Sequence, residues 1–269
     1  MKESYVHGYN ERENTRLHDQ ASTLAELLHT DTRYPAKSRI LEAGCGTGAQ
    51  TVTLAGNSPD ALFVSMDISA SSLATARDRI RRTGIGNVIF YQADIAHPPY
   101  ATGSFDHAFL CFVLEHLKDP DAALRTIRSL LKPGGTITVI EGDHGSAYFY
   151  PDSAAAQAAI NCQVELQRRA GGNALIGREL FPLLQAAGYD SVSVSPRMVY
   201  VDGSRQHLVE GFTRNTFTAM IRGVREAALA ADLSHPAVFD RGISDLYRTT
   251  ESDGVFCYTF FKATARCDR

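Results

Sequence analysis

The feature that most constrains this chain is the segment 40–50, which reads ILEAGCGTGAQ. An apolar run ends in Glu42, glycines follow at alternate positions, and Gln50 opens a segment with a helical pattern. Glycine lets the backbone turn sharply and approach a ligand with no side chain between. A strand, a glycine turn and a helix start in this order predict the nucleotide-binding corner of an α/β sheet.

Two kinds of ligand fit this corner. Gly44, Gly46 and Ala49 also satisfy the G-x-G-x-x-A pattern of dinucleotide-binding loops, so a nicotinamide-dependent oxidoreductase is one alternative. Glu42 argues against it, because a carboxylate at the strand end gains nothing beside a pyrophosphate. A ligand with a cationic end would gain a partner there.

The composition excludes several other classes of protein. The 269 residues carry a net charge of −3, so no overall basicity indicates nucleic acid as a partner. Five cysteines without a C-x-x-C pair argue against a disulfide framework or a zinc site, and no metal site is expected. No apolar run is long enough for a bilayer, so no membrane partner is expected and the predicted location is cytoplasmic.

Further acidic residues follow the next predicted strands. Asp67 ends the apolar run ALFVSMD, 23 residues after Gly44, near the place where an acid accepts ribose hydroxyls in Rossmann-type folds. Asp94 ends the run NVIFYQAD. The segments 104–120 and 131–141 add a fourth and a fifth strand, separated by a helix that Asp119 and Pro120 begin. Five such units predict a doubly wound parallel sheet with ligands at the carboxyl ends of its strands.

These segments together resemble the class I S-adenosylmethionine-dependent methyltransferases. The resemblance rests on E-x-G-x-G-x-G from Glu42, on Asp67 and Asp94, on SFDHAFLCFVLEHLKDP and on LKPGG, and it covers residues 37–140. Within that family the UbiE-like small-molecule enzymes are the most similar. The resemblance implies a Rossmann-like seven-stranded sheet, six strands parallel and the seventh antiparallel, with S-adenosylmethionine as cofactor and S-adenosylhomocysteine as product.

The resemblance also implies roles for individual residues. Asp67 would accept the ribose hydroxyls and Asp94 the adenine amine, and a leading segment with Tyr9 and Arg16 would close over the cofactor. The expected cofactor-binding residues are Tyr9, Arg16, Glu42, Gly44, Cys45, Gly46, Gly48, Gln50, Asp67, Ile68, Ala93, Asp94, Ile95, Cys111 and Phe112.

The chain is expected to have three parts. Residues 1–36 form a cap segment, 37–202 with 254–269 form the methyltransferase core, and 203–253 form a helical insertion between the sixth and seventh strands. The insertion is expected to serve as a lid over the acceptor or as a dimerisation element, so a homodimer is compatible with the sequence.

The methyl acceptor is expected beside the end of the fifth strand. Glu141, Asp143 and His144 stand there, and aromatic residues follow at 148–150. Glu141 and His144 are the candidate general bases for a small, aromatic or heteroaromatic acceptor. The chain is also similar to enzymes of secondary metabolism that methylate indole carbons. A tRNA or protein methyltransferase and a non-catalytic S-adenosylmethionine-binding protein are the remaining alternatives.

Overall fold

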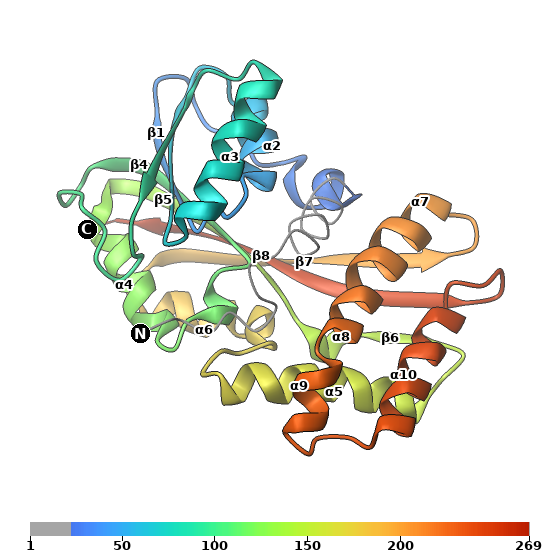
Figure 1. The fold of residues 1–269 in the computed structure, drawn as a ribbon. Coiled ribbons are helices and arrows are strands. Elements are labelled where there is room, and N and C mark those ends of the chain that lie inside the picture. Colours follow the sequence, from blue (N-terminus) through green and yellow to red (C-terminus); the bar gives the residue numbers. More distant parts are fainter. Residues whose placement is uncertain (1–22, 269) are drawn as a thin grey trace. The chain divides into compact units, whose positions relative to one another are not determined.

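The computed structural model describes residues 23–268 of the chain (Figure 1). By the contacts that its backbone makes, the chain divides into two compact units. Among the described residues, unit 1 comprises Gly142–Leu175 and Met198–Phe260 together with residues 23–24. Unit 2 comprises Ala25–Glu141, Ile176–Arg197 and Phe261–Arg269. Because the described residues begin at 23, most of the predicted cap segment 1–36 lies outside them.

Unit 2 contains the predicted run of alternating strands and helices. Its strands follow one another as β1, β2, β3, β4 and β5, and helices stand between them. The elements are β1 (Arg39–Ala43), α2 (Ala49–Asn57), β2 (Leu62–Asp67), α3 (Ala70–Thr83), β3 (Val88–Gln92), β4 (Phe105–Cys111), η1 (Leu114–His116), α4 (Pro120–Leu130), β5 (Leu131–Gly142), η3 (Ile176–Glu179) and α6 (Leu180–Ala186).

The strand order confirms the predicted sheet. It runs β3-β2-β1-β4-β5-β8, and β7 (Asp190–Asp202) pairs with β8 (Val255–Cys267). Counted as the seven predicted strands, this is the order 3-2-1-4-5-7-6 with the seventh strand antiparallel. An eighth strand that the sequence analysis did not predict, β6 (Tyr148–Tyr150), pairs antiparallel with β8. Its three residues are too few for a pattern of alternation to show.

Alternation along the strands explains the core of unit 2. Leu41 and Ala43 of β1 share one buried cluster with Leu124 and Ile127 of α4 and with Leu180 of α6. Residues two apart on a strand point to the same face, so these side chains define the face that α4 and α6 cover. Asp119 begins α4 as predicted, because its carboxylate accepts the N–H of Ala122 at 2.9 Å.

Unit 1 is mostly helical and confirms the predicted helical character of residues 203–253. Within it, α5 packs against α10, and a side chain on Gly242 of α10 would collide with the Ala155 carbonyl of α5. The two helices therefore approach closely at this glycine. The elements are η2 (His144–Ser146), β6, α5 (Ala154–Arg169), α7 (Gln206–Leu208), a π-helix η4 (Val209–Thr218), α8 (Ala219–Gly223), α9 (Arg225–Ala230) and α10 (Pro236–Arg248).

Among the helices of residues 23–268, none combines the length and the apolar character that a membrane span requires.

Candidate cofactor site and acceptor-side residues

Four neighbouring strands of unit 2 bring the predicted cofactor residues to one edge of the sheet. Strands β1, β2 and β3 are parallel, with Ala43 opposite Met66 and Asp67 opposite Gln92. Strand β4 lies beside β1 on the other side and ends at Cys111. The carboxyl ends of parallel strands meet at the same edge, where open α/β sheets bind their ligands.

The glycine loop leads from β1 into α2 and needs glycine for two different reasons. Gly48 has φ +74°, and a Cβ there would lie 2.9 Å from the Cβ of Ala76, so the loop packs directly on α3. Gly46 has φ +52°, but nothing lies within 4 Å of the position that its Cβ would occupy. The loop is therefore packed at Gly48 and open at Gly46, which is where a ligand could approach the backbone.

Asp67 holds the glycine loop in place. Its Oδ2 accepts the N–H of Gly46 and its Oδ1 accepts the N–H of Ser69, both at 2.8 Å. Burial raises the pKa of Asp67, and the backbone N–H groups of Ser69 and Gly46 oppose that rise. A carboxylate has about four acceptor positions, and the backbone N–H of Ile68 is a third donor, so one acceptor position remains for a predicted ribose hydroxyl.

Glu42 lies buried beneath the loop, with 2% of its surface exposed. Thr51 Oγ1 donates to its two carboxylate oxygens at 3.0 and 2.8 Å, and Ser65 Oγ donates to Oε2 at 2.5 Å. Burial raises the pKa of Glu42 to about 7, although the two hydroxyl donors oppose this. A cation that reached this carboxyl would therefore favour its ionised form.

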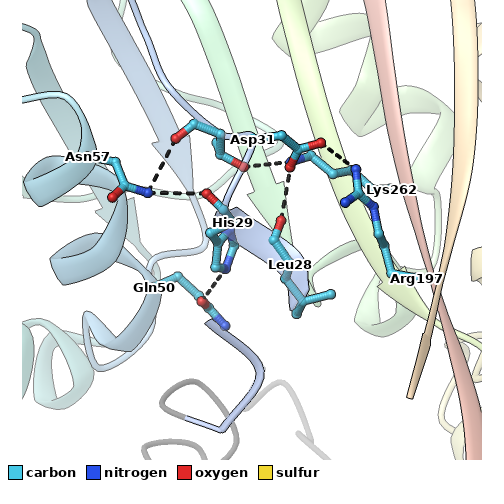
Figure 2. A network of polar contacts seen from close by, with 8 residues as sticks. Leu28, His29, Asp31, Gln50, Asn57, Arg197 and Lys262 are labelled. Atoms are coloured by element: carbon cyan, nitrogen blue, oxygen red, sulfur yellow. Dashed lines mark hydrogen bonds and ion pairs between the residues drawn. The ribbon is translucent and has the colours of Figure 1, made fainter. Parts of the chain in front are cut away.

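Gln50, in the first turn of α2, is held by a histidine that the sequence analysis did not select. His29 Nε2 lies 2.6 Å from Gln50 Oε1 (Figure 2). An amide oxygen only accepts, so the proton stands on Nε2. Burial lowers the pKa of His29 to about 4, which keeps the ring neutral at pH 7.

The adenine side of the predicted site is more open. Asp94 follows β3, and its Oδ1 accepts the N–H of Ala96 at 2.8 Å while Oδ2 lies 3.9 Å from His97 Nδ1. Ile68 is 43% exposed, so an apolar side chain stands at the surface near the strand ends. Ala93 and Ile95 are partly buried against the core of unit 2.

The backbone of the turn after β4 has an unusual conformation. Phe112 has φ +58°, which is rare for a bulky side chain, and its N–H is held by the Ile140 carbonyl at 2.9 Å. Cys111, beside it, has a thiol whose pKa is raised well above its ordinary value by burial, so it stays protonated.

The two candidate bases have different surroundings. Glu141, at the end of unit 2, is fully buried and accepts the N–H groups of Val113 and Leu114 with Oε1, at 2.9 and 2.7 Å. His144, in unit 1, is 6% exposed, and its Nδ1 lies 3.0 Å from Tyr258 Oη.

An aromatic cluster surrounds the His144 side chain in unit 1. The imidazole lies 5.8 Å from the Tyr258 ring and 6.1 Å from the Phe217 ring, measured between centroids. Phe217 in turn lies 4.7 Å from Phe256 and 5.4 Å from Tyr258. We call His144, Phe212, Phe217, Phe256, Tyr258 and Phe260 the aromatic cluster of unit 1.

His29, Thr51, Ser65 and Tyr258 were not among the predicted site residues. Ser65 was identifiable, because it stands two residues before Asp67 on the next strand and faces Glu42 in the parallel register. His29 and Tyr258 gave no such signal, since their partners are 21 and 114 residues away. Tyr9 and Arg16 lie outside the described residues.

Comparisons with known proteins agree with the geometry of unit 2. Residues 40–135 match the family described as a methyltransferase domain. The ubiquinone/menaquinone biosynthesis C-methyltransferase UbiE of Cellvibrio japonicus is 37% identical over 107 residues, which are 38% of this chain and 42% of that protein. Methyltransferase GfsG of Streptomyces halstedii is 31% identical over 126 residues, 46% of this chain and 45% of that protein. The matched segments thus span less than half of either relative.

Solved structures extend the likeness over nearly the whole fold. The crystal structure of the cyclase SpnF has a TM-score of 0.55 at 22% identity and covers 93% of this chain and 80% of its own. The strand order is that of a Rossmann-like methyltransferase fold. The match of residues 40–135 and the similarity to these relatives support the predicted resemblance to the class I S-adenosylmethionine-dependent methyltransferases and S-adenosylmethionine as the cofactor.

Proposed function

We propose that the chain transfers the methyl group of S-adenosylmethionine to a small-molecule acceptor. The observation that carries this proposal is the arrangement of unit 2, where Asp67, Asp94 and the open side of Gly46 follow adjacent strands at one edge of the sheet. The cofactor supplies a methyl group on a sulfonium, so the leaving sulfide departs neutral and needs no proton. The protein has to bind the cofactor and the acceptor, align them with each other and exclude water.

In this proposal the residues of unit 2 bind the cofactor. Asp67 accepts the ribose hydroxyls with the acceptor capacity that the backbone donors Gly46, Ser69 and Ile68 leave open. Asp94 accepts the adenine amine, and Ile68 with Ile95 contacts the base. Glu42 stabilises the cationic end of the cofactor from below the loop.

We further propose that the acceptor is aromatic or heteroaromatic, with an indole carbon as the leading candidate. The support is His144, which stands just after the fifth strand as the sequence predicts, and the aromatic cluster of unit 1 that surrounds it. His144 is the candidate base. In the tautomer whose Nδ1–H donates to Tyr258 Oη, Nε2 carries the lone pair that can take the proton the acceptor loses. The insertion 203–253 would cover the acceptor.

Calorimetric titration with S-adenosylhomocysteine tests the cofactor half. Asp67→Ala should weaken binding by about 10- to 100-fold, the value of one or two hydrogen bonds to a charged acceptor. Asp60→Ala is the matched control. Asp60 is an exposed aspartate that stands just before β2 begins, whereas Asp67 stands where β2 ends. Binding of NADH instead of S-adenosylhomocysteine would replace the proposal with an oxidoreductase.

Transfer itself is tested with methyl-labelled S-adenosylmethionine and a panel of indoles, phenols and aliphatic amines. The SpnF likeness shows why this step is needed, since a cyclase shares the fold and fold alone does not decide the reaction. Label in an indole product supports the proposal. Tight cofactor binding without transfer to any class of acceptor would favour a non-catalytic protein.

A further inference from the structure

Glu141 bridges two segments of unit 2 that are distant in the sequence. It stands near the end of β5, and its Oε1 accepts the N–H groups of Val113 and Leu114, 28 and 27 residues earlier. The side chain is 0% exposed. A buried carboxyl whose single oxygen accepts two backbone N–H groups fixes the position of that backbone segment.

The backbone that it holds is the strained turn after β4. Phe112 has φ +58°, a conformation that costs a bulky residue free energy and persists only where neighbouring contacts fix it. The Ile140 carbonyl holds the Phe112 N–H from one side, and Glu141 holds the next two N–H groups. Three hydrogen bonds from adjacent residues of β5 thus fix this turn.

The Phe112–Val113 turn also contacts the glycine loop. A Cβ built on Gly44 would lie 2.5 and 3.2 Å from the two γ-carbons of Val113. The Val113 side chain therefore packs directly against the backbone of Gly44, the first glycine of the loop. Movement of the Phe112–Val113 turn would remove the contact that supports the loop at this residue.

We propose that Glu141 is a positioning residue that holds the Phe112–Val113 turn against Gly44 and thereby fixes the cofactor-binding loop, and that it is not the general base. This inference rests on the proposed cofactor site. It predicts that the side chain needs an acceptor oxygen at Oε1 and needs no negative charge.

The electrostatics of the site agree with this role. Burial raises the pKa of Glu141 well above its ordinary value, the charge of Glu115 adds to the rise, and the backbone N–H groups of Leu114 and Val113 oppose it. The direction of this shift favours the uncharged carboxyl, and Oε1 can accept the two backbone N–H groups in either protonation state.

Two substitutions separate positioning from catalysis. Glu141→Gln keeps an acceptor oxygen and removes the acid, and Glu141→Leu removes the acceptor at similar volume. We expect Glu141→Gln to bind S-adenosylhomocysteine within twofold of the wild type and to turn over at the wild-type rate. Glu141→Leu should bind it at least tenfold more weakly and show a raised KM for S-adenosylmethionine.

A control variant tests whether a general loss of stability would by itself weaken cofactor binding. Ile140→Val, one residue earlier on β5, loses a buried methyl but keeps the carbonyl that holds Phe112. It should bind S-adenosylhomocysteine as the wild type does. Hydrogen exchange at the amides of Val113 and Leu114 gives a readout that needs no ligand, and it should accelerate in Glu141→Leu alone.

Three results would overturn the inference. If turnover in Glu141→Gln fell at least 100-fold, with one limb of the pH profile removed and binding intact, Glu141 would be the base. Normal cofactor binding by Glu141→Leu would show that the loop does not depend on it. Unchanged exchange in Glu141→Leu would show that it does not hold the turn. Failure of the wild type to bind S-adenosylhomocysteine would instead refute the proposed function, and the exchange data would still decide what Glu141 holds.

Discussion

At the scale of single residues, the glycines of the loop differ in what surrounds them. Gly48 packs against Ala76 of α3, whereas the side of Gly46 that would carry a Cβ is open. Both have positive φ, so alanine at either position incurs the cost of a left-handed conformation, about 1–2 kcal/mol. Any further loss of folding stability depends on the neighbouring atoms. This further loss distinguishes a glycine needed for packing from one needed for ligand binding.

We predict different losses for the two alanine variants. Gly48→Ala should lower the free energy of unfolding by about 2–4 kcal/mol, because the collision with Ala76 adds to the backbone cost. Gly46→Ala should lower it by only about 1–2 kcal/mol yet weaken S-adenosylhomocysteine binding at least tenfold. Urea unfolding and calorimetric titration measure both quantities. Equal stability losses, with binding unchanged in Gly46→Ala, would contradict this assignment.

At the scale of elements, a buried polar network holds residues 28–32, where the helix of residues 23–29 ends, to strand β8. Lys262 of β8 is 4% exposed and donates to the Leu28 carbonyl at 3.2 Å, to Asp31 Oδ1 at 2.5 Å and to Thr32 Oγ1 at 2.7 Å. Arg197 of β7 binds the other oxygen of Asp31 (Figure 2). The Asp31 carboxylate thus joins its own segment to two strands whose contacting residues lie 166 and 231 positions away in the sequence.

We predict that Asp31→Asn lowers the free energy of unfolding by about 1–2 kcal/mol at pH 7, since it leaves the buried Lys262 without a counter-charge. Burial acts to raise the pKa of Asp31, but Lys262 and Arg197 outweigh it and lower the pKa below 3.8. The stabilisation is therefore complete above about pH 4 and is lost as pH falls through the lowered pKa.

Urea unfolding at pH 7 and pH 3 checks this, and the difference between wild type and variant should shrink at the lower pH. The double variant Asp31→Asn with Lys262→Met should recover part of the loss, because it removes the buried charge as well. A loss that stays constant with pH would show that the carboxylate charge plays no part.

At the scale of the whole molecule, two buried groups give stability opposite dependences on pH. The pKa of His29 is lowered by burial to about 4, so the unfolded chain binds more protons between pH 4 and 6.5 and stability rises with pH there. The pKa of Glu42 is raised by burial to about 7, so the folded chain binds more protons between pH 4.5 and 7 and stability falls with pH. Each effect is about 3 kcal/mol over its range.

We predict that the contributions of His29 and Glu42 oppose each other between about pH 4.5 and 6.5, while the raised pKa values of Asp67 and Glu141 add to the fall of stability with pH. Relative to the wild type, His29→Gln should therefore lose about 3 kcal/mol more stability on going from pH 4.5 to 7. Glu42→Gln should show the reverse relative to the wild type, a gain from pH 4.5 to 7. Denaturant midpoints across this range measure both, and two variants with the same slope would refute the assignment.

Much of the fold, and the strand ends at which the predicted cofactor residues stand, could be predicted because their determinants are local. The glycine loop, the ends of the strands at Asp67 and Asp94, and the start of α4 at Asp119 each depend on a few consecutive residues. The role of Glu141 could not be predicted in this way. Its position at the end of a strand suggested a free carboxylate in a crevice, whereas the structure gives it backbone donors from the turn after β4.

The succession of strands and helices, and the loop that turns from β1 into α2, follow from the sequence, since alternation, glycines and caps act through neighbours in the chain. Which charges lie buried, and what they hold, became known from the folded chain: Glu42 lies between Thr51 and Ser65, His29 against Gln50, and Lys262 against Asp31. A pKa or a buried hydrogen bond depends on groups that folding brings together, 231 residues apart in the case of Lys262 and Asp31, and no local pattern records them.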